Sequence, residues 1–207
     1  MTHGSLSIPA RLGLLALDAD RPSGSDPAPA HRLVRAGALA ELARRGLLVD
    51  DDSIATPVDL DSRTGDAVLD GLLELVCESL PHGWRTWVRL RARITADAVR
   101  EQLVAEGLLH AEKRRVLGVF PSVEHRLARP ALVAALREET RQALRGETPV
   151  ERLSARDATV AALAGAARLR TLGGATADVT AAAGNVEIVR ELCAALSAAA
   201  AKAAATA

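Results

Sequence analysis

The sequence predicts a mainly α-helical fold: a single helical domain around a hydrophobic central helix, with one or two small β-hairpins. Apolar residues make up 49% of the chain, and most are Ala, Leu and Val, which favours helix over sheet. Segments with a helical apolar pattern begin after Pro or end at Gly. The 207 residues can bury one large core, so we expect one domain over residues 1–207.

The first part of the chain predicts two helices and a hairpin. A short helix covers residues 6–17, and three prolines in the loop 21–29 exclude helix there. The second helix spans residues 30–45 and ends at Gly46. Two short apolar runs on either side of three aspartates predict a hairpin over residues 47–58.

The middle of the chain predicts two more helices. Thr64 is the expected N-cap of a helix over residues 66–80. Residues 84–93 are basic and partly helical. A further helix over residues 95–106 stops at Gly107.

The last third predicts three helices. Pro130 begins a helix over residues 130–144, and Pro149 begins another over residues 149–172. The last helix starts at residue 175 or 185. Its Ala-rich tail, residues 194–207, either extends that helix or frays.

Charge and motif content argue against several classes of function. The 26 basic and 26 acidic residues give zero net charge, and duplex binding without sequence preference needs a positive field. Aromatic residues are 1% of the chain, which nearly excludes base stacking. No nucleophile elbow, phosphate loop or zinc-protease motif is present. No His has a second metal ligand three or four residues on. We therefore expect no enzyme, no cofactor, no metal and no nucleic-acid partner.

The remaining global features concern the compartment. Cys77 and Cys193 are too few and too distant for a disulfide framework, so we expect two buried, reduced thiols. No signal peptide is recognisable, and no apolar window reaches the ~20 residues of a membrane span. These features predict a cytoplasmic protein whose contact with a membrane is peripheral.

Arg35 lies among small and apolar residues of the second predicted helix. Its neighbours one helical turn away are His31 and Leu39, so no local acid pairs with it, and Arg32 repels it. An arginine in such a setting needs a partner elsewhere in the fold or a bound anion.

Residues 84–93 are the second basic segment. Trp84 and Trp87 share a helix face, and we expect one in the core and the other at a membrane interface or a stacking site. Forked guanidinium hydrogen bonds suit phosphate and carboxylate. The alternative is a solvated basic face paired with nearby acids. The arginines concerned are Arg85, Arg89, Arg91 and Arg93.

Residues 108–120 predict a second hairpin, with a cationic turn over residues 112–115 between apolar arms. Such a protrusion suits an anionic membrane, where each cation near the surface contributes ~1 kcal/mol and apolar side chains insert. The alternative is a hairpin packed on its own domain or on a symmetry mate. The hairpin residues expected at the membrane or at an oligomer contact are Leu109, Lys113, Arg114, Arg115, Leu117 and Phe120.

The chain resembles the Golgi phosphoprotein 3 family, including its bacterial members. An ordered set of stretches that together span most of the chain carries the resemblance. They are LGLLALD (12–18), LVRAGALAELARRGLL (33–48), TGDAVLD (64–70), the helix with Trp87, LVAEGLLHAEKRRVLGVFP (103–121) and VERLSARDATVAALAGAARL (150–169).

The resemblance implies a mostly helical fold with a central hydrophobic helix and a protruding hairpin. Eukaryotic members bind phosphatidylinositol 4-phosphate in a basic pocket, associate with Golgi membranes and bind cytosolic tails of glycosyltransferases. The partners so implied are an anionic phospholipid or phosphoinositide, protein tails, and further copies of the chain through the 108–120 hairpin.

Four positions of the family's pocket can be placed on this sequence. Two arginines match Arg35 and Arg93, a third falls on Ala96, and the pocket tryptophan falls near Asp26. A gapped placement would use Arg100 instead. The resemblance thus assigns headgroup binding first to Arg35 and Arg93, and second to Arg32, Arg91 and Arg100.

Together these features predict a peripheral membrane adaptor that binds a phosphorylated anionic lipid headgroup. The alternative is a winged-helix-like DNA-binding regulator, because the helix 95–106 followed by a basic hairpin has the helix-and-wing order. The acids Asp97, Glu101 and Glu106 on that helix would face phosphates and argue against this alternative.

Overall fold

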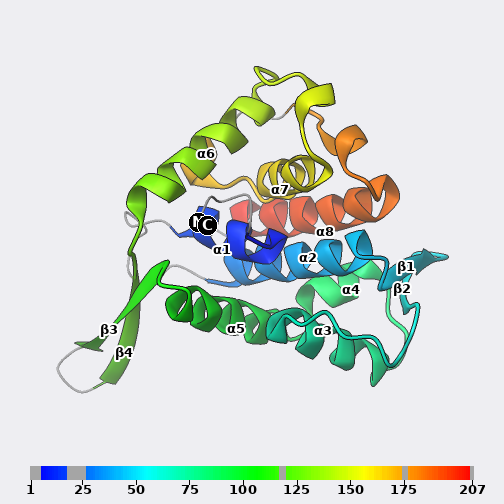
Figure 1. The fold of residues 1–207 in the computed structure, drawn as a ribbon, viewed down its shortest axis with the longest axis horizontal. Helices are drawn as coiled ribbons and strands as arrows, with labels where there is room; N and C mark the ends of the chain where they lie inside the picture. The colour runs from blue at the N-terminus through cyan, green and yellow to red at the C-terminus, as the bar shows by residue number, and fades with distance from the viewer. Residues whose placement is uncertain (1–5, 18–26, 117–119, 174–176, 206–207) are drawn as a thin grey trace.

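The computed structural model describes residues 6–17, 27–116, 120–173 and 177–205 (Figure 1). Over these ranges the chain forms eight α-helices and two separate two-stranded antiparallel sheets. The predicted fold class, mainly α with small hairpins, is confirmed.

Helices α1 (Ile8–Ala16) and α2 (Ala28–Arg44) lie at the centre of the fold. α2 contacts α1, α3, α4, α5, α7, α8 and strand β1, and 12 of its 17 residues are buried. It begins inside the segment that its prolines were expected to keep irregular. Pro29 lies in the first turn, where its missing N–H has no helical partner to lose.

The remaining elements surround this central pair. They are β1 (Leu48–Asp51), β2 (Ile54–Pro57), α3 (Ala67–Cys77), α4 (Trp84–Arg89), α5 (Ala92–Ala105), β3 (Leu109–Val116), β4 (Phe120–Leu127), α6 (Pro130–Leu144), η2 (Val150–Arg152), α7 (Ala155–Ala166), η3 (Arg170–Leu172), η4 (Thr180–Ala182) and α8 (Val186–Ala205).

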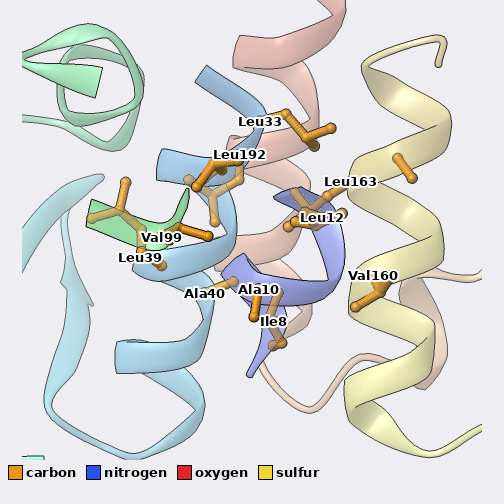
Figure 2. Packing of buried hydrophobic residues seen from close by; sticks show 14 of the residues in the cluster. Ile8, Ala10, Leu12, Leu33, Leu39, Ala40, Val99, Val160, Leu163 and Leu192 are labelled. Atoms are coloured by element: carbon orange, nitrogen blue, oxygen red, sulfur yellow. The ribbon is translucent and has the colours of Figure 1, made fainter. Parts of the chain in front are cut away.

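Gly37 allows α1 and α2 to cross closely. A Cβ atom at this position would lie 2.6 Å from Leu12 Cδ1 and 3.2 Å from the Pro9 Cα atom. The side chains around this crossing form the core shown in Figure 2, where Ile8 and Leu12 of α1 lie between α2 and α7. The pair is therefore held in a tight register that positions the rest of α2.

Three local predictions are wrong. Asp66, not Thr64, caps α3, since its carboxylate accepts hydrogen bonds from the N–H groups of Val68 and Leu69. The helix expected over residues 149–172 is divided, because Ser154 caps a new helix, α7. The helix α5 starts at Ala92, three residues earlier than expected.

The second hairpin is longer than predicted, and its turn is not at residues 112–115. These residues lie within β3, with Lys113 opposite Val123 and Arg115 opposite Pro121. The strands end at Val116 and resume at Phe120. A two-stranded ribbon that extends from the helices (Figure 1) can carry charges on both faces, so charge does not mark its turn.

Candidate functional site

Arg35 is a buried arginine on the central helix α2, with 1% of its surface exposed. Its Nη2 atom donates a hydrogen bond of 2.7 Å to the backbone carbonyl of Arg91. The expected partner from elsewhere in the fold is thus a backbone oxygen at the junction of α4 and α5. This contact neutralises none of the guanidinium charge.

Two nitrogen atoms of Arg35 have no hydrogen-bond partner. Nε and Nη1 are both buried, and neither has an acceptor in the described part of the chain. Burial and, secondarily, the Arg91 guanidinium lower the pKa of Arg35 to about 10, so the group is charged at neutral pH. A buried cation with unpaired donors is energetically unfavourable until an acceptor or an anion meets it.

The backbone at Arg91 shapes this junction. Arg91 has a left-handed conformation with φ of 51° and precedes the first residue of α5 without a side-chain cap. Its carbonyl also accepts the N–H of Ile94 at 3.0 Å. Both α5 and Arg35 are therefore fixed on the same oxygen atom.

The other arginines predicted to bind a headgroup do not share the hydrogen bond between Arg35 and the Arg91 carbonyl. Arg93 is exposed over 81% of its side chain, and its Nε atom lies 3.2 Å from an oxygen of Asp97. Arg100 pairs with the same carboxylate. Arg32 is half-buried on α2, and Ala96 is buried in the core. Arg35 is thus hydrogen-bonded to the backbone of Arg91. Arg93 and Arg100 instead form ion pairs with Asp97.

The remaining predicted site residues have different positions. Trp84 and Trp87 are both buried, so the interfacial tryptophan expected in this segment is absent from it. Trp84 donates its indole N–H to Asp50 at 2.5 Å. Leu109 is buried at the base of the second hairpin. Asp26 and Leu117 lie outside the described residues.

The hairpin cations remain candidates for a membrane or oligomer contact. Lys113, Arg114 and Arg115 are consecutive residues of β3, and Phe120 begins β4. All three cations belong to a paired strand and not to a turn.

The carbonyl of Arg91 is the site feature that sequence reasoning missed. No residue type marks a backbone oxygen as the partner of a distant arginine, so no sequence signal could have identified it. Among the described residues, no group of three His, Cys, Asp or Glu side chains could hold a metal ion. Cys77 and Cys193 are half-buried free thiols, and burial raises the pKa of Cys193 to about 12.

The fold and this site define a helical protein with a buried, incompletely paired arginine at its centre. The family model described as Golgi phosphoprotein 3 (GPP34) matches residues 8–207. The chain therefore belongs to the Golgi phosphoprotein 3 family, a family of non-enzymatic lipid-binding adaptors. A search of curated proteins finds no match. Within the described residues, no helix has the length and apolarity needed to span a bilayer.

Proposed function

We propose that this protein is a peripheral membrane adaptor that binds a phosphorylated anionic lipid headgroup at Arg35. The observation that carries the proposal is the pair of unpartnered Nε and Nη1 atoms on this buried guanidinium. Membership of a lipid-binding family supports the same function.

A phosphate supplies what this guanidinium lacks. Its oxygens are charged acceptors, and hydrogen bonds between an arginine and a phosphate are about twice as strong as neutral ones. Because Nε and Nη1 are covered in the structure described here, the headgroup must displace neighbouring groups to reach them. Part of the binding free energy is then spent on this rearrangement.

The family lipid, phosphatidylinositol 4-phosphate, is the specific ligand that we propose to test first. Two features favour a broader selectivity for anionic phospholipids. Ala96 replaces a pocket arginine and is buried, and Arg93 is paired with Asp97. With fewer fixed cations around the phosphate, the site has fewer groups to distinguish one headgroup from another.

Co-sedimentation with liposomes tests the proposal. Neutral, generally anionic and phosphatidylinositol 4-phosphate-doped vesicles would be compared for the wild type and Arg35→Glu. We expect the wild type to pellet with anionic vesicles, and the variant to lose at least about tenfold in affinity, since charge reversal costs more than one hydrogen bond to a charged group. Arg152→Glu, on an exposed arginine of η2, is the matched control for reversal of one positive charge.

The test has two opposing outcomes. If the wild type and Arg35→Glu pelleted to the same extent, the role of Arg35 in lipid binding would be overturned. No pelleting of the wild type with any vesicle would overturn the lipid function, and salt-sensitive retention on duplex DNA would then favour the DNA-binding alternative.

The β3–β4 ribbon is a second proposed contact surface, for further copies of the chain or for protein tails. Its support is the family resemblance and a run of three cations on β3. A sedimentation-velocity comparison of the wild type with Lys113→Glu would test the oligomer contact. A smaller assembly in the variant is expected, and an unchanged assembly would contradict the proposal.

A further inference from the structure

The segment that connects Arg35 to solvent is strongly basic. Residues 84–96 contain four arginines and no acidic residue. Arg89 and Arg91 are exposed, and no carboxylate of the described residues lies within 4 Å of either one. Arg85 and Arg93 are also exposed and pair with acids of α8 and α5. The junction of α4 and α5 therefore presents unneutralised positive charge to solvent.

Ile94 is an exposed apolar side chain within this basic segment. It lies in the first turn of α5, and 60% of its surface is exposed. Its N–H group and Arg35 both donate to the carbonyl of Arg91. The backbone N–H of Ile94 and the guanidinium of Arg35 therefore meet at the same oxygen atom, while the Ile94 side chain is exposed to solvent.

Another exposed apolar group has the opposite electrostatic setting. Val49, Ile54 and Val58 lie on or directly after the β1–β2 hairpin and are exposed. Aspartates surround them in the sequence, namely Asp50, Asp51, Asp52, Asp59 and Asp61. An anionic surface would repel that region, whereas it would attract the cations around Ile94.

We propose that the first turn of α5 enters the membrane surface. This inference rests on the proposed lipid function. Ile94 inserts among the lipid headgroups, and Arg89, Arg91 and Arg93 contact phosphates around it. An exposed apolar side chain that exposed cations precede in the sequence is the combination that anionic interfaces bind.

The charges of α5 set the orientation of this contact. Asp97 and Glu101 follow Ile94 on the same helix face, three and seven residues further along α5. A helix lying flat would press these acids against the lipid, so the bilayer meets α5 at its N-terminal end. The second hairpin follows the other end of α5 (Figure 1), about 20 Å along a helix of this length.

Vesicle binding by Ile94→Asp tests the inference, with Val150→Asp as the matched control. Val150 is also exposed and lies in η2, between α6 and α7. Figure 1 shows the connection between these two helices on the far side of the fold from α5. With phosphatidylglycerol-containing vesicles, we expect about tenfold weaker binding for Ile94→Asp, because a buried apolar side chain is lost. Binding of the control should be unchanged.

Ile94→Trp provides a readout of insertion that does not depend on loss of binding. Trp84 and Trp87 are buried, so vesicles with brominated acyl chains should quench little of the wild-type fluorescence and much of the added emission. Equal binding of Ile94→Asp and the wild type, or an unquenched tryptophan at position 94, would overturn this inference alone. A wild type that fails to bind any vesicle would overturn the proposed function as well.

Discussion

Two buried charges on one helix have opposite settings in this protein. Glu41 and Arg35 both lie on α2 and are almost inaccessible to solvent. Glu41 is paired with Arg44 and Arg45, and it also accepts the N–H of Ile8 at 3.3 Å. Arg35 has a single backbone acceptor and two unpaired nitrogen atoms. A charge that is completed within the fold serves stability, whereas one left incomplete is available to a ligand.

The pKa values of the two groups reflect this difference. Burial alone would raise the pKa of Glu41, but hydrogen bonds from Arg44 and Arg45 outweigh it and hold the pKa below the usual 4.5. For Arg35 burial dominates and lowers the pKa. Charged partners therefore stabilise the charged form of Glu41, whereas among the described residues Arg35 has only the neutral Arg91 carbonyl to set against its burial.

The largest expected effect on stability is that of Glu41→Gln. The change removes a negative charge that Arg44, Arg45 and, at 4.0 Å, Arg156 share with the first turn of α1, so we expect a loss of about 3 kcal/mol in the free energy of unfolding. Urea unfolding followed by circular dichroism measures it. Surface substitutions usually change stability by no more than about 0.5 kcal/mol. A loss below this value would mean that the ion pairs of Glu41 do not stabilise the fold.

Gly37→Ala should cost somewhat less, about 1–3 kcal/mol, because the added methyl group overpacks the α1–α2 crossing. Gly37 carries no charge, so this variant separates packing from electrostatics. Gly71→Ala is the matched control, since a Cβ atom there meets nothing within 4 Å. Equal stabilities of the two variants would contradict the tight crossing.

The pH dependence of stability should distinguish the two charges further. The pKa of Glu41 is lower in the folded state, so its contribution is complete above the unfolded-state pKa of about 4.5. It is lost as the pH falls through the folded-state value. The stability difference between the wild type and Glu41→Gln should therefore shrink on acidification. A difference that stays constant from pH 7 to pH 3 would show that the carboxylate charge is not involved.

The smallest expected effect is that of Arg93→Gln on vesicle binding. Arg93 is exposed and paired with Asp97, so its loss should weaken binding about threefold or less, as is typical of exposed charges. Titration of anionic vesicles measures it. A loss as large as that of Arg35→Glu would place Arg93 beside Arg35 as an equal headgroup ligand.

Local signals in the sequence predicted most of the fold. Pro130 and the apolar period after it define α6 (Pro130–Leu144), and the two apolar runs around Asp50–Asp52 define the first hairpin. The turn of the second hairpin was misplaced, because charged residues favour turns in general but also occupy a ribbon with two solvated faces.

The site could be predicted only in part. The lack of a local acid near Arg35 predicted either a partner from elsewhere in the fold or a bound anion, and the structure shows a partner of the first kind, the Arg91 carbonyl. The identity of that partner depends on how α2 packs against the α4–α5 junction, which is a tertiary property. For the same reason the sequence placed one tryptophan at an interface, although α4 packs against α2 and α8 and buries both.

The most direct test of the account is Arg35→Met, measured for both stability and vesicle binding. Methionine fills similar space without a charge, and the Arg91 carbonyl keeps the N–H of Ile94 as a donor. We predict that the free energy of unfolding stays the same or rises by about 1–4 kcal/mol, as when buried charges are replaced by apolar groups, while binding to anionic vesicles is lost. A variant that is clearly less stable but still binds would show that Arg35 is a structural residue, and would contradict the account.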